Sequence, residues 1–198
     1  MKLESNMSDE AIASSMEHAI KNVINVKMDE NPIYYTSLFE KLQQILEETK
    51  NDWVEKKARL SEFINRDVNK GEQNEAQELG LTKREFPIFV TLRKTFEGEK
   101  DTEDIVKEDS AVYISDTSID IIKDITKAFN EKMINEWYMV GWAENPTKVS
   151  AIEQKIFMFL LSNSQKIREI YGQDGINKVK ELKESITKLA KIHYANID

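Results

Sequence analysis

The 198-residue sequence has no cysteine, and it contains only six glycines, three prolines and two histidines. The absence of cysteine excludes disulfides, thiol nucleophiles and thiolate metal ligands. Because the turns of β-rich domains depend on glycine and proline, their scarcity favours helices before any pattern is considered. The two histidines, His18 and His193, are far apart in the sequence, so we expect them to be ordinary core or surface residues rather than metal ligands.

The sequence also has no long apolar run. A transmembrane helix needs about 18 to 20 consecutive apolar residues, and no segment approaches that length. The first residues lack the apolar stretch of a secretion signal. Hydrophobic residues make up 40% of the chain and charged residues 32%, as in folded soluble proteins. We therefore expect a cytoplasmic protein without a membrane segment, built as one domain or as two small helical lobes.

The formal net charge of -8 is distributed unevenly along the chain. Residues 97–116 contain eight acidic side chains and two lysines, whereas residues 147–191 contain nine basic and five acidic side chains. The acidic balance of the whole chain argues against a nucleic-acid-binding protein. The C-terminal region, however, is mildly basic.

Helix signals begin near the N-terminus. Ser8 is a predicted N-cap for a short helix to about Val23. The β-branched run at residues 23–28 could extend or end this helix, and we interpret it as a connector. Asn31 and Pro32 start a second, amphipathic helix that continues to about residue 69. A helix of that length would span roughly 50 Å, so we expect a kink near Asn51 or a projecting hairpin.

Polar or glycine-containing segments separate the remaining helices. Residues 69–75 form the first predicted loop, and the Thr82-x-x-Glu85 spacing of a capping box marks the next helix start. Residues 97–116 lack an apolar period and predict a long acidic loop. After this loop, apolar residues at three- and four-residue spacing predict helices up to Val140, from Asn145 to about Tyr171, and from about Ile176 to His193.

These elements predict an all-α fold, a helical bundle of about six helices. The acidic loop at 97–116 would join N-terminal helices over residues 1–96 to a C-terminal helical group over residues 117–198, with a single domain as the alternative. The helix that starts at Asn145 is apolar nearly all round between Phe157 and Leu161. We therefore expect it at the centre of the core.

No pattern in the sequence marks a catalytic or cofactor site. None of the six glycines has the Gly-x-x-x-x-Gly-Lys-Ser/Thr setting that cradles a nucleotide phosphate. Glu-x-Lys tripeptides, which some nucleases place around magnesium, begin at Glu55, Glu153 and Glu181, but each lies within a predicted helix, where the spacing is common. We predict no catalytic, cofactor-binding or metal-binding residue in the chain itself.

The candidate interaction residues are a tryptophan and four basic residues in the C-terminal half. Trp142 is off the apolar period of the preceding helix and could be a surface anchor or a core residue, whereas Trp137 continues that period into the core. Four basic side chains could either contact phosphate or form a solvated face, and they are Lys148, Lys155, Lys166 and Arg168.

Several segments, taken in order, resemble one protein family. They are residues 8–20, 31–63, 80–86, 141–142, 149–151 and 171–172. Together they are similar to the C-terminal helical region of the restriction or motor (R) subunit of type I restriction endonucleases. The segments are spread over most of the chain. The resemblance depends on their order and not on any single motif.

The resemblance implies a non-catalytic assembly domain. It would dock the ATP-dependent motor and nuclease subunit onto the methyltransferase core, which is made of modification and specificity subunits, for restriction of foreign DNA. ATP and magnesium would be bound by other parts of the parent subunit, DNA would be reached through the complex, and the isolated domain would be a monomer. The alternatives are a DNA-contacting helical module of the same complex and a free-standing helical regulator or enzyme.

Overall fold

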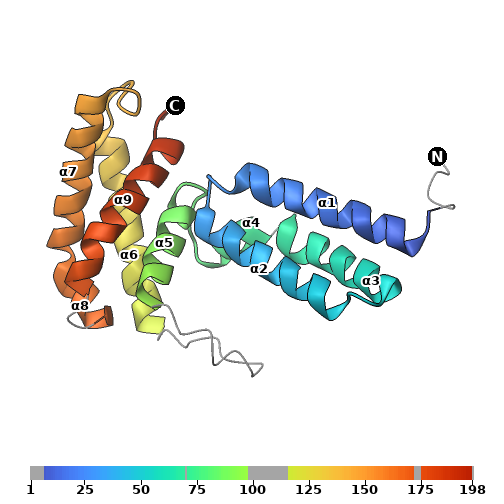
Figure 1. Ribbon diagram of the computed structural model, residues 1–198. Helices are drawn as coiled ribbons and strands as arrows, with labels where there is room; N and C mark the ends of the chain where they lie inside the picture. Colours follow the sequence, from blue (N-terminus) through green and yellow to red (C-terminus); the bar gives the residue numbers. More distant parts are fainter. Residues whose placement is uncertain (1–6, 70, 98–115, 172–174, 198) are drawn as a thin grey trace. The chain divides into compact units, whose positions relative to one another are not determined.

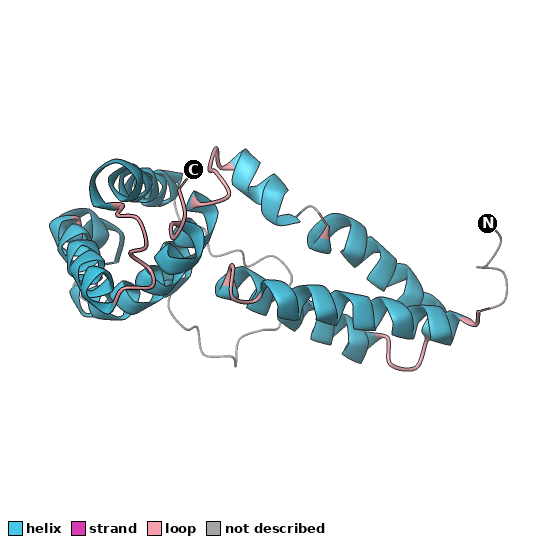
Figure 2. Ribbon diagram, turned by 90° about the horizontal axis from the view of Figure 1, so that it is seen from above, coloured by secondary structure: helices cyan, strands magenta, loops and turns pink. Residues whose placement is uncertain are grey.

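The computed structural model describes residues 7–69, 71–97, 116–171 and 175–197. Within these ranges the regular elements are all helices and no strand is present, which confirms the predicted all-α fold (Figure 1, Figure 2). Nine α-helices are described in place of the expected six or so, because two long helices of the sequence pattern are each divided in two and an additional short helix forms.

The chain divides into two compact units, Met1–Glu78 and Leu79–Asp198. The division therefore differs from the one expected within residues 97–116, most of which lie outside the described residues. Helix α5 (Glu85–Glu97) belongs to the second unit, where it packs against α6 (Asp116–Lys132) and α9 (Gly175–His193). This helix was expected to belong with the N-terminal helices because it lies before the acidic segment. Its apolar face is instead covered by α6 and α9, which follow it in the sequence.

The first unit begins with three helices that pack side by side, α1 (Asp9–Lys27), α2 (Pro32–Glu48) and α3 (Trp53–Phe63) (Figure 1). The side-chain oxygens of Ser8 and Asn31 accept hydrogen bonds from the first-turn amides of α1 and α2, at 3.2 and 3.4 Å, so both predicted N-caps are confirmed. Where the sequence suggested a kink near Asn51, the helix stops at Glu48 and a new one starts with Asp52 as its N-cap.

Two predictions for the first unit are wrong. The expected connector at 23–28 is the last part of α1, because Ile24 is fully buried and its packing continues the helix. The expected loop at 69–75 contains the start of α4 (Gly71–Glu78), which follows a short π-helical segment, η1 (Ile64–Val68). Burial of Ala76 and hydrogen bonds to Glu72 hold this short helix in place, and neither contact is visible in the local sequence.

The second unit starts with a capping box. The Thr82 amide donates to a Glu85 carboxylate oxygen at 2.7 Å, and the Glu85 amide donates to the Thr82 hydroxyl at 3.4 Å, as the sequence predicted. Helix α6 is extended by the π-helical segment η3 (Met133–Trp137), so regular helix ends before Val140. Gly141 then takes a positive φ of 67°, a conformation that glycine adopts without strain.

The next predicted helix is two helices, α7 (Pro146–Ser162) and α8 (Ser164–Tyr171), separated at Asn163. The Asn145 side chain caps α7 by accepting hydrogen bonds from the amides of Thr147 and Lys148, at 3.0 and 3.1 Å, which confirms the predicted start. Helix α7 lies beside α9 (Figure 1). The core that they share with α6 contains a cluster of edge-to-face aromatic rings from Phe129, Trp137, Phe159 and Tyr194.

Candidate interaction surfaces

Trp142 is a core residue of the second unit. Its side chain has no exposed surface, and its indole nitrogen donates a 2.9 Å hydrogen bond to the carbonyl oxygen of Tyr194. The Tyr194 hydroxyl in turn donates to the Asn130 side-chain oxygen at 2.9 Å. The tryptophan therefore ties the segment before α7 to the end of α9, and it does not present a surface anchor. Trp137 is also buried, as its place in the apolar period predicted.

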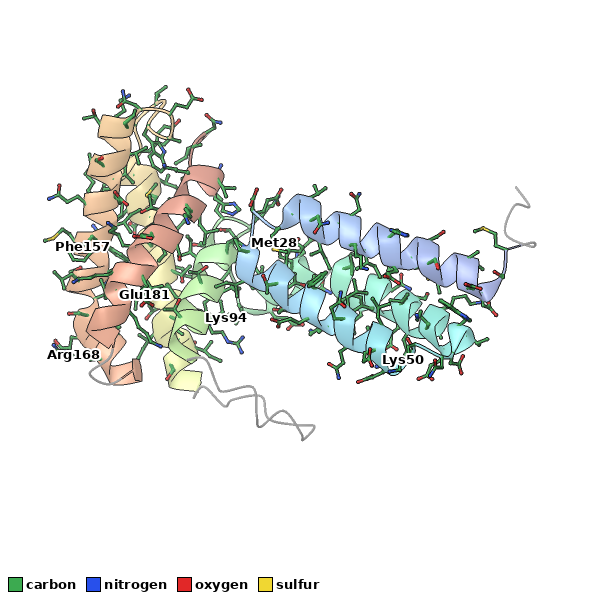
Figure 3. The ribbon with its side chains drawn as sticks, in the orientation of Figure 1. Met28, Lys50, Lys94, Phe157, Arg168 and Glu181 are labelled. Atoms are coloured by element: carbon green, nitrogen blue, oxygen red, sulfur yellow. The ribbon has the colours of Figure 1, made fainter. Side chains whose placement is uncertain are left out.

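The four predicted basic residues do not form one stripe. Lys148 and Lys155 are seven residues apart on α7 and so share a side of that helix, but the Lys148 amine donates to the Val140 carbonyl oxygen at 2.7 Å. Lys166 and Arg168 are exposed on α8 on either side of the buried Ile167. Residues two apart on a helix point about 200° apart, so these two cations diverge. Figure 3 shows Arg168 on α8.

A different set of cations lies on α9. Lys180, Lys188 and Lys191 are exposed on the side of the helix opposite its buried leucines, together with Glu181 and Glu184. The basic excess of residues 147–191 pointed to this region, but no residue of α9 was among the predicted interaction residues. The signal was present, because residues 180, 184, 188 and 191 repeat at the spacing of one helix face.

A groove of about 480 Å³ runs between α7 and α9. Its apolar base is Phe157, and charged side chains of both helices line it: Glu153 on α7, and Lys180, Lys183 and Glu184 on α9. Lys183 and Glu153 approach to 3.5 Å across the groove. This mixture of one aromatic ring with charges of both signs suits an amphipathic partner surface better than a small apolar ligand.

The first unit has a second groove of about 500 Å³ between α1 and α3. It is lined by the apolar residues Met7, Ile12 and Met16, with Ser15 and Lys57. The Lys57 amine forms an ion pair with the carboxylate of Asp9, so the lysine charge at the edge of this groove is already neutralised. Trp53 and Val54, on the preceding turn of α3, are also exposed.

The polar cluster around Tyr35 holds α4 to the rest of the first unit. The Tyr35 hydroxyl donates to a Glu72 carboxylate oxygen at 2.7 Å, and the Asn31 amide group donates to the other oxygen at 3.2 Å. Burial, and after it the Glu72 carboxylate, raises the pKa of Tyr35 above its ordinary value. The hydroxyl therefore remains a protonated donor at physiological pH. Every group in this cluster has a partner, so its role is structural.

The remaining sequence candidates lie on ordinary helix surfaces. Glu55, Glu153 and Glu181, which begin the Glu-x-Lys tripeptides, lie on α3, α7 and α9. Among the described residues, no group of three or more His, Asp or Glu side chains could hold a metal ion. No helix in the described ranges combines the length and apolar character needed to cross a membrane. Compared with known proteins, the chain matches no family model, no curated protein and no solved structure.

Proposed function

We propose that this chain is a non-catalytic assembly domain of the R subunit of a type I restriction endonuclease. It would hold the motor and nuclease subunit on the methyltransferase core, so that translocation and cleavage of foreign DNA are coupled to recognition of the site. The proposal starts from the ordered segments that resemble the family. Its partners would be the modification and specificity subunits.

The proposal rests mainly on the structural roles of the residues that resemble the family. Gly80 has a φ of 66°, Leu81 is buried, and Thr82 forms the capping box that starts α5. Gly141 and Trp142 form the turn and the buried anchor ahead of α7. These residues set backbone geometry and core packing rather than presenting a reactive group, which supports an assembly role over a chemical one.

Outward-facing apolar side chains give the proposal a second support. Met158 is 55% exposed and Leu161 is 38% exposed on α7, within a helix whose other side is fully packed. Adjacent exposed apolar side chains on a folded helical unit are typical of protein contact sites.

The test is direct binding of the purified chain to the cognate methyltransferase core, immobilised for biolayer interferometry. We expect saturable binding with a Kd in the micromolar range or tighter, which corresponds to about 8 kcal/mol of binding free energy. The modification subunit alone and an unrelated methyltransferase are the controls. Absence of binding at about 10 µM chain would contradict the proposal.

A further inference from the structure

The outward side of α9 carries four exposed charges that are sorted by sign. Glu181 and Glu184 come first along the helix, and Lys188 and Lys191 follow. The four residues are spaced by three, four and three positions, so they form one stripe along a single side of the helix. Figure 3 shows Glu181 on α9. We call these four residues the α9 outer stripe.

Contacts within the chain do not account for the α9 outer stripe. In the part of the chain that the structure describes, none of its four side chains forms an ion pair or a hydrogen bond. The helix dipole favours a cation in the last turn, where Lys191 lies. That effect falls off within one turn, and Glu181 and Glu184 lie beyond the first turn of α9. The sorted charges are therefore available to a contact outside the chain.

The order of the charges fits a second copy of the same helix in the antiparallel direction. If the two-fold axis passes at the level of Ile186, Glu184 faces Lys188 of the second copy. Glu181 then faces Lys191 of the second copy, and the symmetry repeats both pairs. A parallel arrangement would instead set like charges against each other. A shift of one turn from this register would do the same, because it places Glu184 against Glu184 or Lys188 against Lys188.

The residues beside the stripe fit the same arrangement. Ser185 is exposed next to the position of the axis, and its small side chain allows the two helices to approach closely. Lys180 of one copy lies at the level of Ile192 of the other, which is 46% exposed. The methylene stem of the lysine can cover this isoleucine while its amine stays in water. The contact therefore has a small apolar part at each end.

We propose that two copies of this chain associate through their α9 outer stripes, in antiparallel orientation about a two-fold axis at the level of Ile186. The stripe is only about 15 Å long and mostly charged, so the dimer is weak, with a Kd of about 0.1 mM at low salt. Salt screens the ion pairs and weakens the dimer further. The inference goes beyond the proposed function and does not depend on it, and the dimer would replace the monomer that the family resemblance implies.

The experiment is sedimentation velocity of the full chain at about 10–500 µM in about 50 mM NaCl. Glu181→Lys with Glu184→Lys makes the stripe entirely basic, and Lys188→Glu with Lys191→Glu makes it entirely acidic. Each double variant alone should self-associate at least about tenfold more weakly than the wild-type chain. An equimolar mixture of the two should associate at least as tightly as the wild-type chain, because every lysine then faces a glutamate.

Two controls separate the stripe from general effects of charge and folding. Glu47→Lys with Glu55→Lys makes the same change in net charge at exposed positions of the first unit, and it should leave self-association unchanged. Exchanging the sign of all four stripe residues should restore self-association, which a folding defect would not do. Circular dichroism of each variant checks that the helices are intact.

Three results would overturn the inference. The first is a chain that stays monomeric up to about 500 µM at low salt, which would leave the stripe to solvent or to a different protein. The second is a dimer that the double variants do not weaken. The third is an equimolar mixture of intact double variants that does not associate. Because none of these measurements uses the methyltransferase core, failure of the dimer and failure of the restriction-enzyme role are distinguishable.

Discussion

Replacing Trp142 by phenylalanine should destabilise the second unit by roughly 2–4 kcal/mol. The indole nitrogen is the donor to the Tyr194 carbonyl oxygen at 2.9 Å, and Trp142 is fully buried. Phenylalanine leaves that carbonyl without its donor, at a cost of about 1–3 kcal/mol. The smaller ring adds roughly 1 kcal/mol for lost contacts and the space left behind. The fold should survive, because the aromatic cluster around Phe129 remains.

The measurement is urea unfolding followed by far-UV circular dichroism, with the free energy of unfolding obtained by linear extrapolation. Because the chain has two compact units, the data are fitted with two transitions if the units unfold separately. Trp53→Phe is the matched control. Trp53 is 38% exposed, and its main polar contact is the Lys56 amine 4.4 Å from the ring centroid. That change should cost about 0.5–1 kcal/mol. Equal effects of the two substitutions would refute the assignment of Trp142 as a core anchor.

Three further predictions follow from other contacts. Burial raises the pKa of Tyr35 and of Tyr194 above the ordinary 10.0, so their contribution to stability is complete below about pH 10 and is lost at higher pH, by about 1.4 kcal/mol per pH unit for each tyrosine. In the Tyr194→Phe variant, the urea midpoint should fall less between about pH 10 and pH 11 than it does in the wild-type chain. An equal fall in the two proteins would contradict this. Thr82→Ala should cost about 1 kcal/mol and Thr82→Ser much less, because only the serine hydroxyl can still accept the hydrogen bond from Glu85; equal thermal midpoints would argue against the capping box. Gly141→Ala should lower the free energy of unfolding in urea by about 1–2 kcal/mol, because Gly141 has a φ of 67° that alanine adopts only with strain, although there is open space for the added methyl group. No change in stability would mean that the turn can adopt another conformation.

Helix starts could be predicted from the sequence because capping is local. Ser8, Asn31 and Asn145 each accept a hydrogen bond from an amide two or three residues away, so the residues that decide the geometry are neighbours in the chain. Helix ends were less predictable. Residues 23–28 resemble a β-branched connector by composition, yet burial of Ile24 keeps most of them helical. Tertiary packing overrides such weak local preferences.

The candidate surface was only partly predictable. The sequence marked Lys148, Lys155, Lys166 and Arg168 by charge, but it could not show that Lys166 and Arg168 diverge around a buried Ile167. It also left Trp142 open between surface and core. The Tyr194 carbonyl that holds the indole is 52 residues away, and no local pattern encodes that contact.

Composition and neighbouring residues are enough to specify the helical class, the main helix starts and the shortage of residues for thiol or nucleotide-phosphate chemistry. Which helices form each unit, and which side of α7 is covered, depend on contacts between residues that are far apart in the chain. Between Phe157 and Leu161 the sequence is apolar on every side, so it carries no preference for one face. Packing against α9 and the aromatic cluster buries Phe159 and Leu160 and leaves Met158 and Leu161 exposed to solvent.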